Sequence, residues 1–361
     1  MKKILICANT LCIGGIEKSL INLLKNIDKS QFKIDLMLEE RSGELIKEVP
    51  KNINILEYKV YNLKNKFIQK LLNFLNQIKW TLKYKNKYDT SICFATYSYA
   101  ANKVARILSK NRILFVHSDY TKIYNETELK EFFDTRNLSD FNIIIFVSNE
   151  SKENLIKFYP NIVDKSLVIN NIIDINEIKE KSEYKIEKIY NKNNINLLFI
   201  GRLEEESKNI STQLKLIKDL SIDIPNIKLF IVGDGPNKND YIKYVRENNL
   251  EKYIEFIGQK ENPYPYIKNA DYVLLTSNYE GYPVIFNESI LLKTDILSTI
   301  KISDDYTCIG ENFGYLLSNN YNETLNELKI ILKTKKHKKT NINLEEINKK
   351  RLKKLEELLN E

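Results

Sequence analysis

The sequence predicts an α/β protein with two doubly wound parallel sheets. Apolar runs of strand length alternate with helix-like segments along nearly all of the 361 residues. Most of these runs are continuous rather than alternating, which is typical of strands covered by helices on both faces. With 43% hydrophobic residues, the chain is long enough to bury two cores. Two domains are therefore expected, each a parallel sheet between helical layers.

The apolar runs predict strands in two series. The first series covers residues 4–8, 32–38, 53–58, 91–95, 113–116, 143–147 and 167–169. The second covers residues 197–200, 227–232, 253–257, 272–275, 296–299 and 315–317. A stretch rich in Lys, Glu and Asn separates them between residues 171 and 194. We expect an N-terminal domain over 1–173, a second domain over 174–335, and a C-terminal helix within 336–361.

The opening residues and the cysteines favour the cytoplasm. The first apolar run ends at Asn9, too early for the core of a signal peptide, and no run is long enough to span a membrane. No Cys-x-x-Cys pair and no histidine near a cysteine are present, so neither a zinc site nor a disulfide framework is predicted. The cysteines are Cys7, Cys12, Cys93 and Cys308.

The most informative stretch is Glu-Gly-Tyr-Pro-Val-Ile-Phe-Asn-Glu at residues 280–288. Its first acid follows a predicted strand and its second lies about two turns into the next helix, so both are expected to face a crevice. Gly281 permits close backbone approach, and Pro283 suits the first helical turn. Helix N–H groups favour an anion, and carboxylates accept hydrogen bonds from hydroxyls. A nucleotide sugar carries both groups.

Three other segments place glycines or cations at predicted strand ends. They are Gly14-Gly15, Gly201-Arg202-Leu203 with Lys208, and Gly233-Asp234-Gly235-Pro236. Together with residues 280–288, they resemble the retaining glycosyltransferases of family 4, and the resemblance runs from Gly14 to about residue 318. It implies the GT-B fold, in which two Rossmann-like domains face a central crevice. The first would bind the acceptor and the second the nucleotide sugar.

The resemblance also implies roles for individual residues. Arg202 and Lys208 match the cations that stabilise the departing diphosphate without a metal. Glu288 matches the acid that holds the ribose, while Glu280 and His117 match groups that contact the transferred sugar. The expected catalytic residues are Glu280, His117, Arg202 and Lys208. The expected donor-binding residues are Gly14, Gly15, Arg202, Lys208, Gly258, Gly281, Tyr282, Pro283, Val284 and Glu288.

Ordinary structural roles are the alternative for each motif: surface ion pairs, unrelated helix acids, a strand-to-helix turn, or a histidine bonded to backbone. The sequence departs from the family in the spacing between Arg202 and Lys208, which is one residue longer than in the commonest form. Asn209 also replaces a frequent glycine, although Asn tolerates the left-handed conformation. The loop 258–262 is expected to contact the base through its backbone.

No metal or cofactor is predicted. The sequence lacks the Asp-x-Asp motif with which transferases of the other major fold hold Mg²⁺. Asp304 and Asp305 lie in a loop-like stretch and are expected to be solvated. In the family, the final helix crosses back to the first domain; a helix that packs only locally is the alternative for residues 344–360.

The net charge of +8 is unevenly distributed. Residues 61–88 contain seven lysines and no acid, interleaved with apolar residues at helical spacing. Such a basic amphipathic helix is expected to lie on an anionic membrane surface. The alternative is a helix packed on the sheet with a solvated basic face. A nucleic-acid-binding module is not evident.

The sequence thus predicts a retaining, metal-independent glycosyltransferase, cytoplasmic and peripheral on the inner face of the plasma membrane. It would transfer a hexosyl or N-acetylhexosaminyl unit from a nucleotide diphosphate sugar, UDP-sugars being favoured, to a sugar or lipid-linked saccharide in bacterial surface polysaccharide or glycan assembly. A sugar-nucleotide epimerase of the same fold, which would need no acceptor, is one alternative. A catalytically silent nucleotide-sugar-binding partner is another, and the intact cations and acids argue against it.

Overall fold

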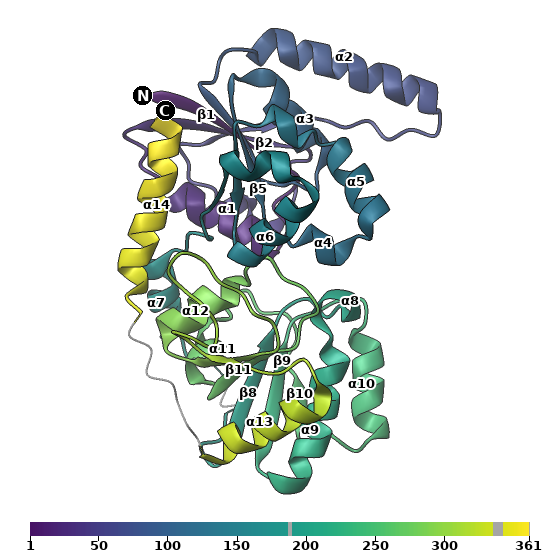
Figure 1. Ribbon diagram of the computed structural model, residues 1–361, viewed down its shortest axis with the longest axis vertical. Helices are drawn as coiled ribbons and strands as arrows, with labels where there is room; N and C mark the ends of the chain where they lie inside the picture. The colour runs from purple at the N-terminus through teal and green to yellow at the C-terminus, as the bar shows by residue number, and fades with distance from the viewer. Residues whose placement is uncertain (187–189, 335–341, 361) are drawn as a thin grey trace. The chain divides into compact units, whose positions relative to one another are not determined.

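The computed structural model describes residues 1–186, 190–334 and 342–360, which form two α/β units (Figure 1). Unit 1 comprises Met1–Ile173 together with the C-terminal residues from Asn348 onward. Unit 2 comprises Asp174–Ile347. The predicted boundary between residues 335 and 336 lies outside the described residues.

Unit 1 is built on a parallel sheet with the strand order β3-β2-β1-β4-β5-β6-β7. Its strands are β1 (Lys2–Ala8), β2 (Phe32–Leu38), β3 (Asn54–Glu57), β4 (Thr90–Cys93), β5 (Asn111–Val116), β6 (Ile143–Phe146) and β7 (Ser166–Val168). Its α-helices are α1 (Gly15–Asn26), α2 (Lys66–Tyr84), α3 (Tyr99–Leu108), α4 (Tyr120–Ile123), α5 (Glu126–Asp134) and α6 (Asn149–Phe158). Short 3-10 helices are η1 (Glu44–Glu48), η2 (Leu138–Asp140) and η3 (Pro160–Lys165).

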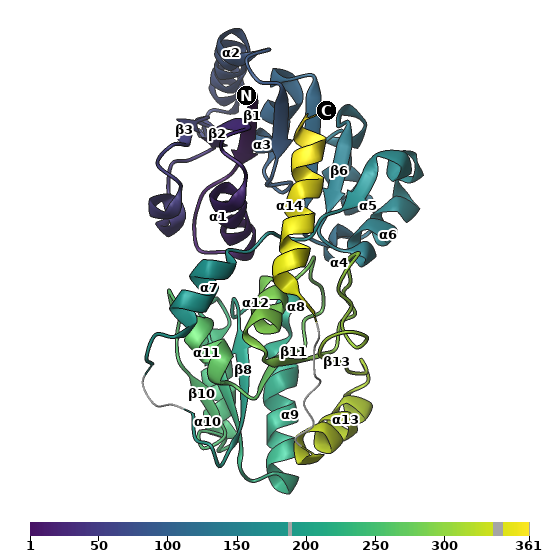
Figure 2. The ribbon, with the colours of Figure 1, turned by 90° about the vertical axis from the view of Figure 1, so that its left-hand side faces the viewer.

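Helices cover both faces of this sheet, so successive strand residues enter different cores. Ile4 and Ile6 of β1 pack with α1, whereas Leu5 and Cys7 pack with α3. This is the reason that the strand sequence is continuously apolar. Helix α14 (Leu344–Asn360) runs along the α1 face (Figure 2), where its Leu355 joins the core.

Unit 2 has a parallel sheet with the strand order β10-β9-β8-β11-β12-β13. Its strands are β8 (Ile195–Ile200), β9 (Ile227–Val232), β10 (Ile254–Phe256), β11 (Tyr272–Leu275), β12 (Asp295–Ser298) and β13 (Tyr315–Leu316). Its helices are α7 (Ile175–Ser182), α8 (Glu205–Lys208), α9 (Ile210–Asp223), α10 (Lys238–Glu247), α11 (Tyr264–Asn269), α12 (Val284–Leu292) and α13 (Tyr321–Thr334). Every described strand overlaps a predicted run, and the prediction of two doubly wound parallel sheets is confirmed.

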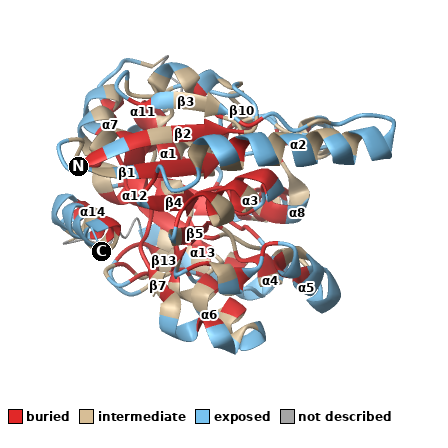
Figure 3. Ribbon diagram, turned by 90° about the horizontal axis from the view of Figure 1, so that it is seen from above, coloured by how far each residue is buried: buried red, intermediate tan, exposed pale blue. Residues whose placement is uncertain are grey.

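Helix α2 is exposed along most of its length (Figure 3), and its apolar side faces away from unit 1. Of its residues only Trp80 is buried. At about 100° per residue, a set of large apolar side chains shares one face and Trp80 lies on the opposite one. These side chains are between 40% and 83% exposed: Phe67, Ile68, Leu71, Phe74, Leu75, Ile78 and Leu82.

The polar side of α2 is the side that is tied to unit 1. Asn73 exchanges two hydrogen bonds with the backbone of Tyr61, of 2.8 and 3.1 Å, and Asn76 donates to the carbonyl oxygen of Lys59 at 2.9 Å. Both asparagines lie on the Trp80 side of the helix. A helix that packs its apolar side on the sheet is therefore not the arrangement observed.

Candidate active site

The loops that follow β8 and β11 are neighbours at the carboxyl edge of the unit 2 sheet. The strand order reverses between these two strands, and such switch points are where open α/β sheets bind ligands. Arg202 and Lys208 follow β8, and Glu280 follows β11. The sequence motifs therefore converge on one edge.

Lys208 and Glu280 form an ion pair in which Nζ lies 2.5 Å from Oε1. The hydroxyl of Ser277 donates to the same oxygen at 2.9 Å. The two side chains are only 22% and 14% exposed. The cation and the carboxylate are thus held side by side in a partly desolvated place, where such contacts are stronger than at an open surface.

Direct bonds fix the two loops that carry this pair. The hydroxyl of Thr276 donates to the carbonyl oxygen of Asn209 at 2.9 Å. The backbone N–H of Asn278 donates to the carbonyl oxygen of Ser207, also at 2.9 Å. Asn209 itself has φ 48° and ψ 49°, the left-handed conformation that the family's glycine would adopt easily. The replacement therefore leaves Lys208 at the end of α8, directed at the loop after β11.

Arg202 is held less tightly than Lys208. Its side chain is 68% exposed, and its nearest carboxylate oxygen, on Glu204, lies 3.6 Å away. Such a contact contributes little to stability. The guanidinium can therefore turn toward an anion without breaking a strong bond.

Glycines allow the neighbouring loops of this edge to touch. Gly233, after β9, has φ 150°, and a Cβ placed there would lie 1.9 Å from the carbonyl oxygen of Gly201. The N–H of Gly233 donates to the carbonyl of Gly258, after β10, at 3.1 Å. Three successive loops are therefore joined through backbone, with Gly258 at their outer end.

The second acid lies closer to the start of its helix than predicted. Helix α12 begins at Val284 with Pro283 as its N-cap, so Pro283 precedes the first turn instead of lying in it. Glu288 is the fifth helical residue, a little over one turn in rather than two, and it is 8% exposed. Tyr282 is buried beneath the loop, where its hydroxyl lies 2.8 Å from that of Thr307.

The prediction of a solvated Asp304 is wrong. This residue is 8% exposed, and its carboxylate accepts hydrogen bonds from the N–H of Tyr306 and from the N–H and hydroxyl of Thr307. It closes a turn that supports Tyr282 through Thr307. An Asx turn of this kind depends on residues just downstream, which an Asp-Asp pair alone does not reveal.

In unit 1, Gly14 and Gly15 lie where β1 leads into α1. Gly14 is the N-cap of this helix, and no side chain caps it. The loop before it rests on Gly43, whose φ is 110° and whose added Cβ would lie 2.0 Å from the carbonyl carbon of Leu11. No role is predicted for Gly43 from the sequence, although the turn-like Arg-Ser-Gly after the second predicted strand is a signal for it.

His117 follows β5 and is buried between aromatic rings. Its ring centroid lies 4.4 Å from that of Phe94 and 5.6 Å from that of Phe115. Burial lowers the pKa of His117 to about 3, although a hydrogen bond with Asn171 acts in the opposite direction. Nε2 has no hydrogen-bond partner among the described residues. The imidazole is neutral at physiological pH because burial disfavours its charged form.

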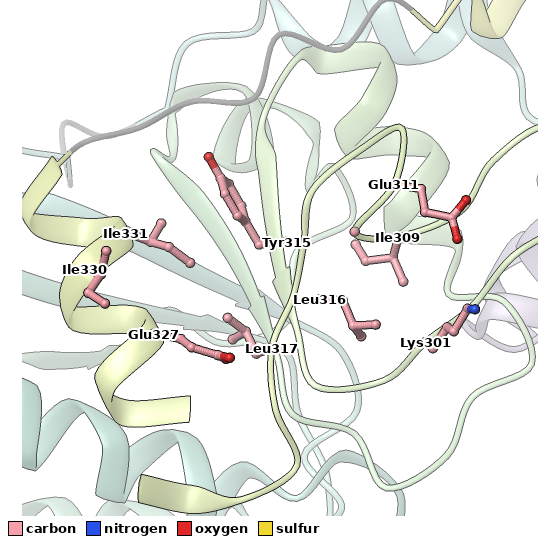
Figure 4. A pocket seen from close by; sticks show the side chains of 10 residues that line it. Lys301, Ile309, Glu311, Tyr315, Leu316, Leu317, Glu327, Ile330 and Ile331 are labelled. Atoms are coloured by element: carbon pink, nitrogen blue, oxygen red, sulfur yellow. The ribbon is translucent and has the colours of Figure 1, made fainter. Parts of the chain in front are cut away.

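A cavity of about 470 Å³ in unit 2 lies away from these residues. It is bounded by β13, α13 and the loop that contains Lys301 and Glu311 (Figure 4). None of the predicted donor-binding residues lines it. Among residues 1–186, 190–334 and 342–360, no cluster of three or more His, Cys, Asp or Glu is arranged to hold a metal, and no helix is long and apolar enough to cross a bilayer.

Comparison with known proteins identifies the family. Residues 13–177 match the model of glycosyltransferase family 4, and residues 179–351 match that of the glycosyl transferases group 1. This chain belongs to glycosyltransferase family 4, whose second domain is that of the glycosyl transferases group 1. It is a glycosyltransferase of the GT-B fold, as predicted.

Individual relatives are distant. An uncharacterised glycosyltransferase of Methanocaldococcus jannaschii is 28% identical over 44% of this chain and 39% of its own length. A Campylobacter jejuni transferase, N-acetylgalactosamine-N,N'-diacetylbacillosaminyl-diphospho-undecaprenol 4-alpha-N-acetylgalactosaminyltransferase, is 25% identical over 94% of this chain and 92% of its own. The crystal structure of Anabaena HepE with UDP superposes with a TM-score of 0.72 at 17% identity, covering 99% and 100% of the two chains.

Burial of a neutral His117 predicts acid sensitivity. The unfolded chain takes up a proton on this residue below its ordinary pKa of about 6.5, whereas the folded protein does so only near pH 3. Its contribution to stability is therefore complete above about pH 6.5 and decreases as the pH falls, by about 2 kcal/mol at pH 5. Denaturant unfolding at pH 7.5 and 5.0 should show a smaller loss in His117→Asn than in wild type. Equal losses would mean that His117 titrates normally.

Proposed function

We propose that this glycosyltransferase transfers a hexosyl or N-acetylhexosaminyl unit from a nucleotide diphosphate sugar, with UDP as the favoured nucleotide, to a saccharide or lipid-linked saccharide. This proposal rests on the Lys208–Glu280 pair at the switch point of unit 2, with Arg202 six positions before Lys208 after the same strand. A cation suits the diphosphate and a carboxylate suits the hydroxyls of the sugar. A single Lys–Glu pair could therefore bind the diphosphate and the sugar, the two groups joined by the bond that breaks.

Leaving-group stabilisation is the proposed source of catalysis. As the bond from the sugar C1 to the diphosphate oxygen breaks, negative charge grows on the phosphates, and fixed cations then bind the transition state more tightly than the ground state. The acceptor hydroxyl attacks C1 from the face that the diphosphate leaves, and its proton passes to a departing phosphate oxygen. The products are a glycoside of retained configuration and a nucleoside diphosphate, with no metal required.

Two relatives support the choice of donor and acceptor. The Anabaena crystal structure is a complex with UDP, and the Campylobacter jejuni protein is a transferase that acts on a diphospho-undecaprenol-linked saccharide. By analogy, we assign this chain to the assembly of a bacterial surface glycan. His117 and Glu280 would contact the transferred sugar, and Glu288 the ribose.

Membrane attachment through residues 61–88 is part of this proposal. The outward face of α2 carries Phe67, Leu71, Phe74 and Leu82. Lys70 and Lys79 flank this face at about 100° per residue, and the whole segment has no acidic residue. Apolar side chains can enter the interfacial region of a membrane, and the lysines that border them can attract anionic lipid headgroups. The protein would lie on the inner face of the plasma membrane.

The diphosphate role of the cations is testable by mutation. Arg202→Ala and Lys208→Ala should each lower turnover of a UDP-sugar on the order of a hundredfold, because each removes a charge that stabilises the leaving group. Lys228→Ala is the matched control, since this lysine is also 22% exposed and pairs with Glu255 at 2.5 Å. Wild-type turnover in EDTA should be unchanged. Full activity in either variant, or a loss in EDTA that Mg²⁺ restores, would refute the mechanism.

Calorimetry with UDP should distinguish the roles of the two acids, Glu280 and Glu288. Glu288→Ala should weaken UDP binding by about tenfold or more, the equivalent of 1.4 kcal/mol. Glu280→Ala should leave UDP affinity intact or raise it, because Lys208 loses the carboxylate that competes with phosphate. Turnover and sugar selectivity should nevertheless fall in Glu280→Ala. Similar losses of UDP affinity in both variants would contradict the assignment.

Membrane attachment should depend on salt and on α2. Sedimentation with phosphatidylglycerol vesicles should weaken as salt rises, since exposed charges are screened over about 8–10 Å at physiological strength. Replacing Lys64, Lys66 and Lys70 by Glu should abolish sedimentation but spare transfer to a soluble acceptor.

A matched control reverses three exposed lysines of unit 2, Lys215, Lys243 and Lys252, and should still sediment. A variant with Phe67→Ser and Phe74→Ser tests the apolar contribution separately, and it should also lose binding. If sedimentation does not change with salt and persists after the charge reversal in α2, this surface does not bind the membrane through its lysines.

A further inference from the structure

The segment between β12 and β13 contains none of the residues assigned to the donor, yet it is tightly bonded. It forms a hairpin in which the N–H of Ile309 donates to the carbonyl oxygen of Ile302 at 3.2 Å. At the tip, the N–H of Asp304 donates to the carbonyl oxygen of Thr307 at 2.8 Å. The carboxylate of Asp304 accepts three hydrogen bonds within this turn. The tip therefore has one well-defined conformation.

Asn312 ties the same turn a second time. Its side-chain oxygen accepts from the N–H of Cys308, and its amide donates to the carbonyl oxygen of Tyr306, both at 2.9 Å. Together with the bonds to Asp304, these contacts fix the backbone on both sides of Thr307, which is only 1% exposed. Thr307 is therefore a fixed point in the interior of unit 2.

The hydroxyl of Thr307 joins this hairpin to the loop 280–283. Its oxygen lies 2.8 Å from Oδ1 of Asp304 and 2.8 Å from the hydroxyl of Tyr282. A threonine hydroxyl has one proton to donate, and here the carboxylate receives it. Tyr282 is therefore the donor in the other bond. The result is a chain of hydrogen bonds that ends on a carboxylate, and bonds to a charged acceptor are the stronger ones.

Tyr282 connects this chain to the backbone that carries Glu280. It is 3% exposed and belongs to the loop just before α12 begins. Its side chain is thus held at Cα by the loop and at its hydroxyl by the hairpin. Two positions earlier, Glu280 pairs with Lys208. A shift of Tyr282 would consequently move the carboxylate relative to the ammonium.

Aromatic rings hold the start of α12 separately from this hydrogen bond. Phe286, in the first turn of the helix, meets Phe313 edge-on with ring centroids 5.5 Å apart. Both rings are almost completely buried. Edge-to-face pairs of this kind are favourable in their own right. Loss of the Thr307 hydroxyl should therefore release the loop but keep the helix that carries Glu288 in place.

We propose that Thr307 is a positioning residue, which acts through Tyr282 to hold Glu280 in register with the lysine beside it. Thr307 is buried and acts on the loop, not on the donor. Misplacement of a contact by about 1 Å can lower a rate about a hundredfold, so a small shift of the loop is measurable. The inference rests on the proposed glycosyltransferase function.

Thr307→Val tests this role, because it keeps the shape of the side chain and removes the hydroxyl. Turnover of a UDP-sugar should fall about tenfold or more in Thr307→Val and in Tyr282→Phe. UDP affinity by calorimetry should stay within about twofold, since Glu288 keeps its place. Thr307→Ser retains the hydroxyl and should restore turnover. The double variant should fall no further than either single one, because both remove the same bond.

Thr324→Val is the matched control. Thr324 is 2% exposed in the same unit, and its hydroxyl donates to the carbonyl oxygens of Ser318 and Asn320 at 2.6 and 2.9 Å. Stability should fall in both valine variants, but turnover only in Thr307→Val. Four results overturn the proposal: equal turnover in the two valine variants, no rescue by Thr307→Ser, additive losses in the double variant, or a parallel loss of UDP affinity.

Hydrogen–deuterium exchange separates this inference from the proposed function. Peptides that cover residues 280–286 should exchange about tenfold faster in Thr307→Val, but at wild-type rates in Thr307→Ser and Thr324→Val. If no form turns over a UDP-sugar but this pattern is seen, the proposed function fails and the positioning of the loop stands. If wild type is active and Thr307→Val matches it, only the positioning role fails. Tyr282→Phe gives the same readouts from the other end of the bond if Thr307→Val does not fold.

Discussion

The proposed donor site depends on the ion pair between Lys208 and Glu280. It joins the loops after β8 and β11 where the strand order reverses, and it is mostly shielded from solvent. A partly buried charge left without a partner is costly, so each side chain keeps the other in place before a ligand arrives. In the proposed mechanism, a diphosphate would exchange one anionic partner of Lys208 for another, instead of stripping water from an isolated ammonium. The carboxylate of Glu280 would then be available to sugar hydroxyls.

The same topological rule places different chemistry in each unit. In unit 2, the loops at the switch point carry opposite charges, which would suit the phosphate and hydroxyl groups of the proposed donor. In unit 1, the corresponding edge carries a neutral His117, a half-buried Glu39 and tyrosine rings. Burial keeps His117 uncharged, so it cannot repel or attract a phosphate strongly.

Local sequence patterns were enough to predict the strands, whereas the details of the site depend on contacts between residues far apart in the sequence. Continuous apolar runs predicted the strands because periodicity depends only on neighbouring residues. The partnership of Lys208 with Glu280 spans 72 positions and follows from strand order, which no short motif states. Gly43 went unnoticed for the same reason, because its importance arises from its contact with Leu11. Glu288 was misplaced by part of a turn because the helix begins after Pro283.

Helix α2 shows where an amphipathic pattern is ambiguous. The pattern specifies two faces but not which one meets the protein, and hydrophobic burial alone would place the apolar face inward. The structure does the reverse, because Asn73 and Asn76 satisfy backbone groups of residues 59–61 while Trp80 fills the core. Full burial of each exposed Phe or Leu stabilises by about 1.5–3 kcal/mol, so covering these side chains would favour binding of α2 to a lipid surface.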